Sequence, residues 1–215
     1  MSYDPATKIQ ELSAFGEFGG VNPSITDSST YTFLKSETMK ELFESEIEGC
    51  FLYSRHWNPS NKYLSDAISA LENSEASQIT SSGISAIACA ILQICEQGDE
   101  IISSRTIYGG TYALFKNVLP KFGISVKFVD ILDLNMVNKN ITSKTKMVYC
   151  ESISNPLLDV SDLPELSKIT KKHGIKLVVD NTFSPMAITP INHGADIVIH
   201  SLTKFINGTS DCVAG

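Results

Sequence analysis

Several common signatures of metal sites, disulfide frameworks and secreted proteins are missing from this sequence. The 215 residues include five cysteines, and none are placed at the Cys-x-x-Cys spacing of zinc or redox motifs. The four histidines are scattered too, and we expect no metal site. The first ten residues have no apolar core like that of a secretory signal. We therefore expect reduced, mostly buried thiols and a cytoplasmic protein.

Positive charge and long apolar stretches are also scarce. The formal net charge of −7 argues against nucleic acid or an anionic membrane as the main partner. The most apolar helix-like run, residues 84–94, is too short to cross a bilayer. Charged residues make up 19% of the chain and hydrophobic residues 42%, the balance of an ordinary globular protein with a sizeable core.

Glycine and proline interrupt any regular pattern in the first 60 residues. Gly16, Gly19 and Pro23 lie in a stretch rich in serine and threonine, which predicts an extended arm over residues 1–60 with one short helix near Glu37–Glu46. The remaining residues, 61–215, are expected to form one domain.

Within residues 61–215, short apolar runs alternate with helical patterns. This alternation predicts an α/β domain with a mostly parallel sheet and helices on both faces. The strand candidates are 76–80, 100–104, 125–129, 146–151, 176–180 and 196–200. The helix candidates are 63–73, 83–96, 111–122 and 162–173, with a short turn at 190–193. Asp162 and Glu165 have the spacing of a capping box, and Gly174 is placed to end that helix.

Lys204 is the candidate for covalent chemistry. It follows an apolar strand and two hydroxyls, Ser201 and Thr203, and few charged residues lie near it in the sequence. Such surroundings favour the neutral amine, which condenses with aldehydes. Because the hydroxyls suit a phosphate, the pattern suggests pyridoxal phosphate (PLP). The alternative is a lysine that opens a surface loop, which is the more common case for a lone lysine.

The other candidate residues also follow apolar strands or strand-like runs. Because the carboxyl ends of parallel strands share one edge of a sheet, the polar residues after them are expected to meet there. They are Ser81-Ser82-Gly83, Tyr108-Gly109-Gly110, Ser154-Asn155-Pro156, Asp180-Asn181 and Ser201 to Lys204. The Gly-x-Gly-x-x-Gly fingerprint of dinucleotide sites does not accompany them.

Each of these motifs has a functional and a structural interpretation. Ser82-Gly83 opens an apolar helix whose first amides suit a phosphate, although an ordinary serine N-cap explains the same residues. Asp180 needs a cation such as a protonated pyridine nitrogen, or it caps the next turn. The Tyr108 ring can stack on a planar cofactor or be a partly buried loop side chain. Arg55, two residues after Tyr53, can reach a phosphate on a neighbouring subunit or stay solvated.

Taken together, the motifs resemble those of the cystathionine/methionine family of PLP-dependent enzymes, whose large domain has the aspartate-aminotransferase (type I) fold. The matching segments cover nearly the whole chain and are Tyr53–Pro59, Ser81–Ile87, Tyr108–Thr111, Asn155-Pro156, Val179–Thr182 and His200–Phe205. Within the family, Phe15–Asn22 and the Tyr-Ser-Arg-His form at 53–56 are most similar to methionine γ-lyases. The resemblance implies a carbon–sulfur lyase of sulfur amino acids, which converts L-methionine to methanethiol, 2-oxobutanoate and ammonia.

The resemblance also implies a role for each matched residue. Lys204 would hold the cofactor covalently and then act as general base and acid. Asp180 would hold the pyridine nitrogen, and Tyr108 would stack on the ring and help the thiol to leave. Asn155 would contact the ring hydroxyl. In a homo-oligomer, expected to be a dimer of catalytic dimers with shared sites, the phosphate would be bound by Ser82, Gly83, Ile84, Ser201 and Thr203 of one subunit and by Tyr53 and Arg55 of another.

Two positions depart from the family pattern. Methionine is common where Ile84 stands, which matters little because the backbone amide would bind the phosphate. Some bacterial methionine γ-lyases have a cysteine where Gly110 stands, which weakens the case for strict methionine specificity. Cystathionine γ-lyase, cystathionine γ-synthase and acylhomoserine sulfhydrylase are therefore alternatives.

Family members are nearly twice as long as this chain, and a further apolar strand is expected to begin near Cys212. We therefore expect a truncated large domain that lacks the C-terminal small domain and its carboxylate-binding arginine. A truncated, non-catalytic protein is the alternative from a different class. Because uncovered sheet edges favour association, residues 1–215 alone are expected to aggregate and to lack lyase activity.

Overall fold

The computed structural model describes residues 3–12, 16–44, 47 and 49–215. Contacts divide the chain into two compact units, Met1–Ile79 and Thr80–Gly215. The division lies after the predicted boundary at residue 60, because helix α3 (Pro59–Glu72) packs with α1 (Pro5–Gln10). Phe15 and the last two residues of the predicted helix 37–46 lie outside the described residues.

The first unit is less extended than the sequence suggested. Besides α1 and α3, its described part contains α2 (Ser36–Glu44) and a 3-10 turn at Glu17–Gly19. The α1 helix was not predicted, although Asp4 caps it and Pro5 begins it. Asn58 caps α3 in the same way, since its side chain accepts a hydrogen bond from the Asn61 N–H (2.8 Å).

A five-stranded parallel sheet forms the centre of the second unit, with strand order β2-β1-β3-β4-β5. Its strands are β1 (Glu100–Ser104), β2 (Ser125–Val129), β3 (Thr145–Glu151), β4 (Lys176–Asp180) and β5 (Ile197–Ile199). The predicted strand at 76–80 is wrong. Only Thr80 pairs there, through two backbone hydrogen bonds with Gly215 (2.7 and 3.0 Å), and the segment near Cys212 is not a strand either.

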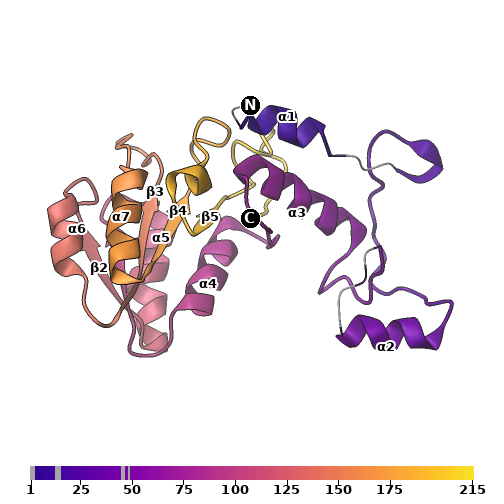
Figure 1. Cartoon of the computed structure of the whole chain (residues 1–215), viewed down its shortest axis with the longest axis horizontal. Helices are drawn as coiled ribbons and strands as arrows, with labels where there is room; N and C mark the ends of the chain where they lie inside the picture. Colours follow the sequence, from indigo (N-terminus) through magenta and orange to yellow (C-terminus); the bar gives the residue numbers. More distant parts are fainter. Residues whose placement is uncertain (1–2, 13–15, 45–46, 48) are drawn as a thin grey trace. The chain divides into compact units, whose positions relative to one another are not determined.

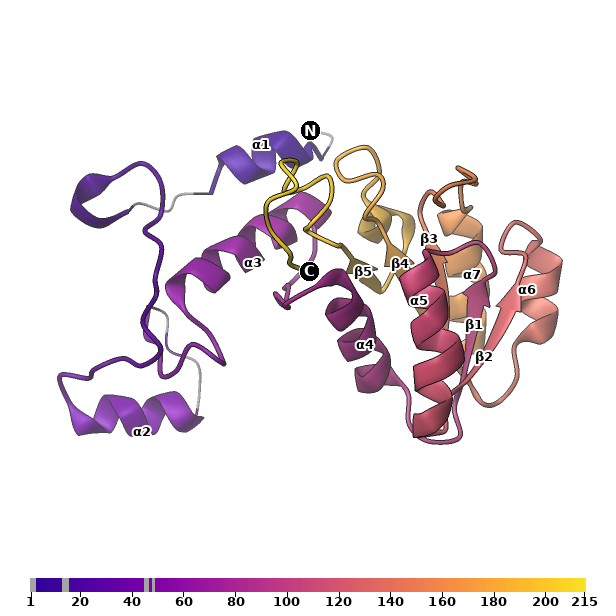
Figure 2. The same cartoon turned by 180° about the vertical axis from the view of Figure 1, so that it is seen from behind.

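Helices cover both faces of this sheet, as the sequence predicted. Figures 1 and 2 show α4 (Gly83–Ile94) and α5 (Gly109–Ala113) on one face, with α6 (Leu134–Asn140) and α7 (Leu163–His173) on the other. Alternate residues of β3 point to the two sides: Met147 joins the core under α4, and Val148 joins the core under α7. The unit therefore has two buried cores separated by the sheet.

Local signals explain most helix ends of the second unit. The predicted helix 111–122 lies within α5, a π-helical turn (Leu114–Val118) and a 3-10 turn (Leu119–Phe122), and a further 3-10 turn spans Pro190–His193. Asp162 caps α7 by accepting from the Glu165 N–H (3.2 Å), and Gly174 ends it with a φ of 67°. The Glu165 carboxylate pairs with Lys168, so only half of the predicted capping box forms.

All five cysteines are free thiols, but only Cys95 and Cys150 are buried, while Cys89 and Cys212 are exposed. The expectation of mostly buried thiols is therefore wrong. Burial raises the pKa of Cys95 to about 11 and that of Cys150 to about 12, so both stay protonated. No helix within the described ranges is long and apolar enough to cross a membrane, and the cytoplasmic location stays a prediction.

Candidate active site

A cavity of about 840 Å³ lies at the carboxyl edge of the sheet, in the second unit. Open parallel sheets bind ligands at this edge, because strand ends and helix starts meet there. The residues of this unit to which the resemblance gave a role all line the cavity: Ser82, Gly83, Ile84, Tyr108, Asn155, Asp180, Ser201, Thr203 and Lys204. The expected convergence of the strand-end motifs is thus observed.

Tyr53 and Arg55 belong to the first unit, whereas the cavity lies in the second. The Arg55 guanidinium carbon lies 5.0 Å from the centre of the Tyr53 ring. The two side chains therefore form a cation–π pair with each other.

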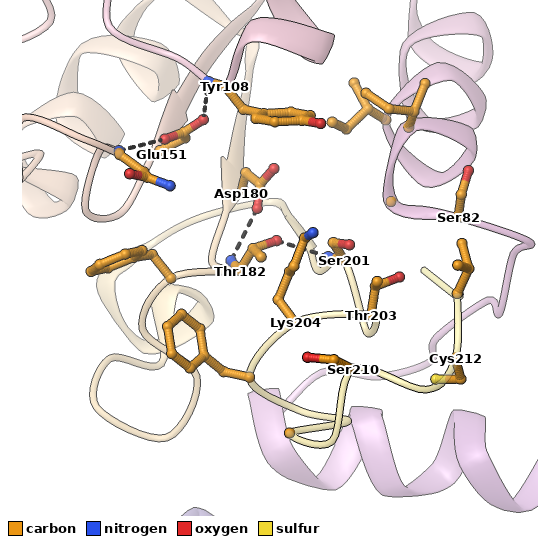
Figure 3. A pocket seen from close by; sticks show the side chains of 18 of the residues that line it. Ser82, Tyr108, Glu151, Asp180, Thr182, Ser201, Thr203, Lys204, Ser210 and Cys212 are labelled. Carbon is orange, nitrogen blue, oxygen red and sulfur yellow. Dashed lines mark hydrogen bonds between the residues drawn. The ribbon is translucent and has the colours of Figure 1, made fainter.

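Lys204 lies in the turn that follows β5. Its side chain is exposed and points into the cavity, and the Tyr108 ring extends over the same space from the loop after β1 (Figure 3). The ion pairs of the described residues do not include Lys204. Its amine is therefore placed to meet a ligand in the cavity rather than a carboxylate of this chain.

Asp180 ends β4 and is buried, and each of its carboxylate oxygens has a donor. The Thr182 N–H donates to Oδ1 (3.0 Å), and the Tyr149 hydroxyl donates to Oδ2 (3.2 Å). Burial raises the pKa of Tyr149 well above its ordinary value, so this hydroxyl keeps its proton. The turn-capping interpretation is therefore correct for Asp180, and its carboxylate also lines the cavity.

Thr182 links the Asp180 turn to the loop that carries Lys204. The Thr182 hydroxyl oxygen accepts a hydrogen bond from the Ser201 N–H at 2.7 Å. Through its N–H and its hydroxyl, Thr182 thus contacts both Asp180 and Ser201 (Figure 3). Sequence reasoning included Thr182 in a matching segment but not among the site residues.

The start of α4 and the Ser201 turn approach each other closely at Gly83. A Cβ atom at Gly83 would lie 2.7 Å from the Ser201 Cβ and 2.9 Å from its Cα, so only glycine fits without a shift of the backbone. The first amides of α4 have no partner four residues earlier in the helix, and they lie beside serine and threonine hydroxyls. This donor set fits the phosphate of PLP.

Two of those hydroxyls already have partners. The Ser82 Oγ caps α4 by accepting from the Ser85 N–H (3.1 Å). The Thr203 Oγ1 donates to the Ala214 carbonyl (3.2 Å) and accepts from the Ala214 N–H (3.0 Å). The N-cap interpretation of Ser82 is therefore correct, and the Thr203 hydroxyl has to reorient before it can donate to a phosphate.

Gly110 controls the place of the Tyr108 ring. A Cβ atom at Gly110 would lie 2.5 Å from the Tyr108 Cε1. Any side chain at position 110 would therefore require the ring to move. Tyr108 is 54% exposed, so the open side of the cavity leaves room for a planar ligand against its ring.

Glu151 is a cavity residue that sequence reasoning missed. It ends β3, is buried, and accepts from the backbone N–H groups of Tyr108 (2.6 Å) and Asn155 (3.2 Å). Burial raises the pKa of Glu151 to about 7, against the two N–H donors that lower it, and the charge of Asp180 raises it further. A carboxylate at the end of an apolar strand was the signal that identified Asp180, and the same signal was present for Glu151.

Comparison with known proteins agrees with this geometry. Residues 7–215 match the family model described as Cys/Met metabolism PLP-dependent enzyme. The chain belongs to this family. Methionine γ-lyase from Arabidopsis thaliana is 44% identical over 218 residues, and O-acetyl-L-homoserine sulfhydrylase from Leptospira meyeri is 40% identical over 207. These matches cover 99% and 92% of the chain but 49% and 47% of the relatives, so the chain spans about half their length.

Solved structures of the Cys/Met metabolism family share the fold. The crystal structure of an O-acetylhomoserine (thiol)-lyase from Campylobacter jejuni matches with a TM-score of 0.93 at 29% identity, over 99% of this chain and 53% of that one. It contains a pyridoxyl-lysine phosphate group. The predicted family, the PLP-dependent transferase fold and the PLP cofactor are thus confirmed.

The raised pKa of Glu151 predicts a pH-dependent stability. The ordinary pKa is 4.5 and the folded value is about 7, so between these values the folded state holds a proton that the unfolded state has released. Stability therefore falls as pH rises from about 4.5 to about 7 and is level above. The size is about 3 kcal/mol, at about 1.4 kcal/mol per pKa unit. Urea unfolding of wild type and Glu151→Gln from pH 4.5 to 8 should show wild type losing this amount relative to the variant.

Glu100 is the matched control for this measurement. It is as buried as Glu151, at 7% exposure, but lies at the amino end of β1. Burial alone would raise the pKa of Glu100, but hydrogen bonds from Lys127 and Thr145 lower it overall. Glu100→Gln should therefore keep a nearly constant stability difference from wild type over this pH range, because that difference is lost only as pH falls below 4.5. If the free energies of unfolding of wild type and Glu151→Gln change with pH in parallel, the raised pKa of Glu151 is contradicted.

Proposed function

We propose that the protein is a PLP-dependent carbon–sulfur lyase that eliminates methanethiol from L-methionine and leaves 2-oxobutanoate and ammonia. The observation that carries the proposal is the meeting of Lys204, Asp180 and the phosphate-suited donors around Gly83 in one cavity. The similarity to the Arabidopsis methionine γ-lyase, over 99% of the chain, supports the choice of substrate.

When bound, PLP supplies an aldehyde and a ring that withdraws electrons from the substrate. Lys204 holds the cofactor through its amine and moves the proton at the substrate α-carbon. Asp180 keeps the ring nitrogen protonated. Tyr149 and Thr182 hold the Asp180 carboxylate in place. Tyr108 lies against the ring and assists the leaving thiol.

The remaining residues bind the ends of the cofactor. The amides of Gly83 and Ile84 and the hydroxyls of Ser82, Ser201 and Thr203 hold the phosphate, and Asn155 contacts the ring hydroxyl. Tyr53 and Arg55, which belong to the other unit, come from a second subunit, as the family resemblance implies. A homo-oligomer of catalytic dimers thus has shared active sites.

Replacement chemistry on O-acetylhomoserine is a second candidate function. The Leptospira sulfhydrylase is 40% identical to the chain, and the Campylobacter structure is of a thiol-lyase with the same substrate name. The two functions are distinguished by assaying thiol release from L-methionine and homocysteine formation from O-acetylhomoserine with sulfide, in the whole protein. If the protein forms homocysteine but releases no thiol from L-methionine, O-acetylhomoserine rather than L-methionine is its substrate.

Lys204 is predicted to carry the cofactor. After borohydride reduction of PLP-loaded protein, peptide mass spectrometry should locate the pyridoxyl group on Lys204. Lys204→Ala should take no stable label, because no other lysine lines the described cavity. Lys176→Ala, which removes an exposed lysine paired with Asp196, serves as the control and should label normally. A label on a different lysine would contradict the assignment.

Asp180→Asn is predicted to lower turnover by on the order of 10²-fold or more while the fold is retained, the usual size of effect when a preorganised charge is removed. A neutral amide does not keep the ring nitrogen protonated, so the α-carbanion is less well stabilised. The control is Asp196→Asn, in a carboxylate that accepts from the Leu177 N–H outside the cavity. Turnover within twofold of wild type in Asp180→Asn would leave the residue as a turn cap alone.

Arg55 is predicted to act in trans. Inactive Arg55→Ala and inactive Lys204→Ala subunits, after exchange, should recover about a quarter of wild-type activity, because half of randomly mixed dimers are mixed and each has one intact site. Mixing Lys204→Ala with Asp180→Asn should recover nothing, since both residues line the same cavity. Absence of rescue with proven subunit exchange would count against shared sites.

A further inference from the structure

The Glu151 carboxylate holds two loops that follow neighbouring strands. Its Oε1 accepts from the N–H of Tyr108, after β1, and its Oε2 accepts from the N–H of Asn155, after β3 (Figure 3). Strands β1 and β3 lie side by side where the strand order changes direction, which is the usual ligand crevice of such sheets. Glu151 therefore connects the two loops across this crevice.

Glu151 is held at the end of a strand, whereas Tyr108 lies in a loop. Glu151 lies opposite Asp180 in the β3–β4 register, and its own carbonyl accepts from the Ser161 hydroxyl (2.7 Å). Tyr108, in contrast, is followed by two glycines, which restrict the backbone little. No side chain caps the helix that begins there. The place of Tyr108 thus depends on what its N–H contacts.

The two contacts require a carboxylate. Both partners are backbone N–H groups, which only donate, and an ionised carboxylate offers only acceptors. A glutamine in the same place would turn its own NH₂ group toward one of the donors. These two amides are the hydrogen-bond partners of the Glu151 side chain in the described part of the chain.

The charge is costly where it stands. Glu151 is buried beside Asp180, and burial together with that neighbouring charge raises the pKa of Glu151 to about 7. A neutral side chain would avoid this cost but would lose one of the two hydrogen bonds. The cost of burying this carboxylate is therefore offset by its hydrogen bonds to both loops.

We propose that Glu151 is a positioning residue, which sets where the Tyr108 ring and the Asn155 side chain meet the cofactor and does not itself touch the reacting atoms. The inference rests on the proposed function in one respect, that Tyr108 and Asn155 contact PLP. The hold of Glu151 on the two loops is testable without PLP.

The first measurement is amide hydrogen exchange in the whole protein without cofactor. Glu151→Gln should lower protection of the Tyr108 or Asn155 amide by about tenfold or more, because a charge-assisted hydrogen bond is lost. The matched control is Glu100→Gln, a buried carboxylate at the opposite end of the sheet that accepts from Thr142 and Thr145 side chains. It should leave both amides as protected as in wild type. Unchanged protection in Glu151→Gln would overturn the proposal.

The second measurement is PLP binding, by titration of the protein with PLP and by visible circular dichroism of the bound cofactor. Glu151→Gln should weaken binding by about tenfold and lower the dichroism per bound PLP, whereas Glu100→Gln should change neither by more than about twofold. In a Tyr108→Ala/Asn155→Ala background, Glu151→Gln should have no further effect, because it acts through those residues. A full tenfold effect in that background would overturn the proposal.

If the glutamine variant does not fold, Glu151→Asp tests the positioning role of Glu151 instead. It keeps the charge but is one methylene shorter, so it should lose the longer contact to Asn155 and give an intermediate PLP affinity. Wild-type protection and affinity in this variant would contradict the proposal. If wild type itself does not bind PLP, the proposed function fails, while the exchange measurement still reports on Glu151.

Discussion

Two carboxylates end neighbouring strands of the sheet, and the site is built around the need to satisfy them. Asp180 and Glu151 lie opposite each other in the β3–β4 register, and both are buried. Each oxygen of each carboxylate has its own donor: Tyr149 and Thr182 for Asp180, and two loop amides for Glu151. Because buried carboxylate oxygens without donors are costly, the contacts that satisfy these oxygens also hold the loops after β1, β3 and β4 in place.

Two glycines complete the site by allowing close approach. At Gly83 the start of α4 lies against Ser201, so amides from one segment and hydroxyls from another face the same space. At position 110 a side chain would collide with the Tyr108 ring, so glycine allows the ring to occupy its observed place. The first glycine brings together the donors for an anion, and the second sets the place of an aromatic surface. The first contact includes Ser201, which is in the same turn as the lysine, whereas the second lies in a different loop, and both determine what the lysine meets.

Sequence reasoning predicted the strands at 100–104, 125–129 and 176–180 with the observed bounds, because apolar runs between turn residues specify buried parallel strands. It failed for residues 76–80, since a strand also needs a neighbour and only Gly215 pairs there. Tyr108, Asn155 and Asp180 were predicted at the cavity because they follow apolar strands or strand-like runs. Tyr149 and Thr182 were not, because their roles come from hydrogen bonds across strands and loops that periodicity does not encode. Glu151 was within reach of the argument used for Asp180.

The cavity explains why cofactor chemistry is easier to infer than substrate choice. The residues at the strand ends are suited to a phosphate, a pyridine nitrogen and an aldehyde, which are parts of PLP, and no arginine is among the described residues that line the cavity. An amino-acid substrate also needs a cation for its carboxylate, and Lys204 is the cation that lines the cavity. Because Lys204 is assigned to the cofactor, the lining formed by the described residues offers no second cation for that carboxylate. The strand-end residues therefore support an inference about the cofactor more directly than one about the substrate.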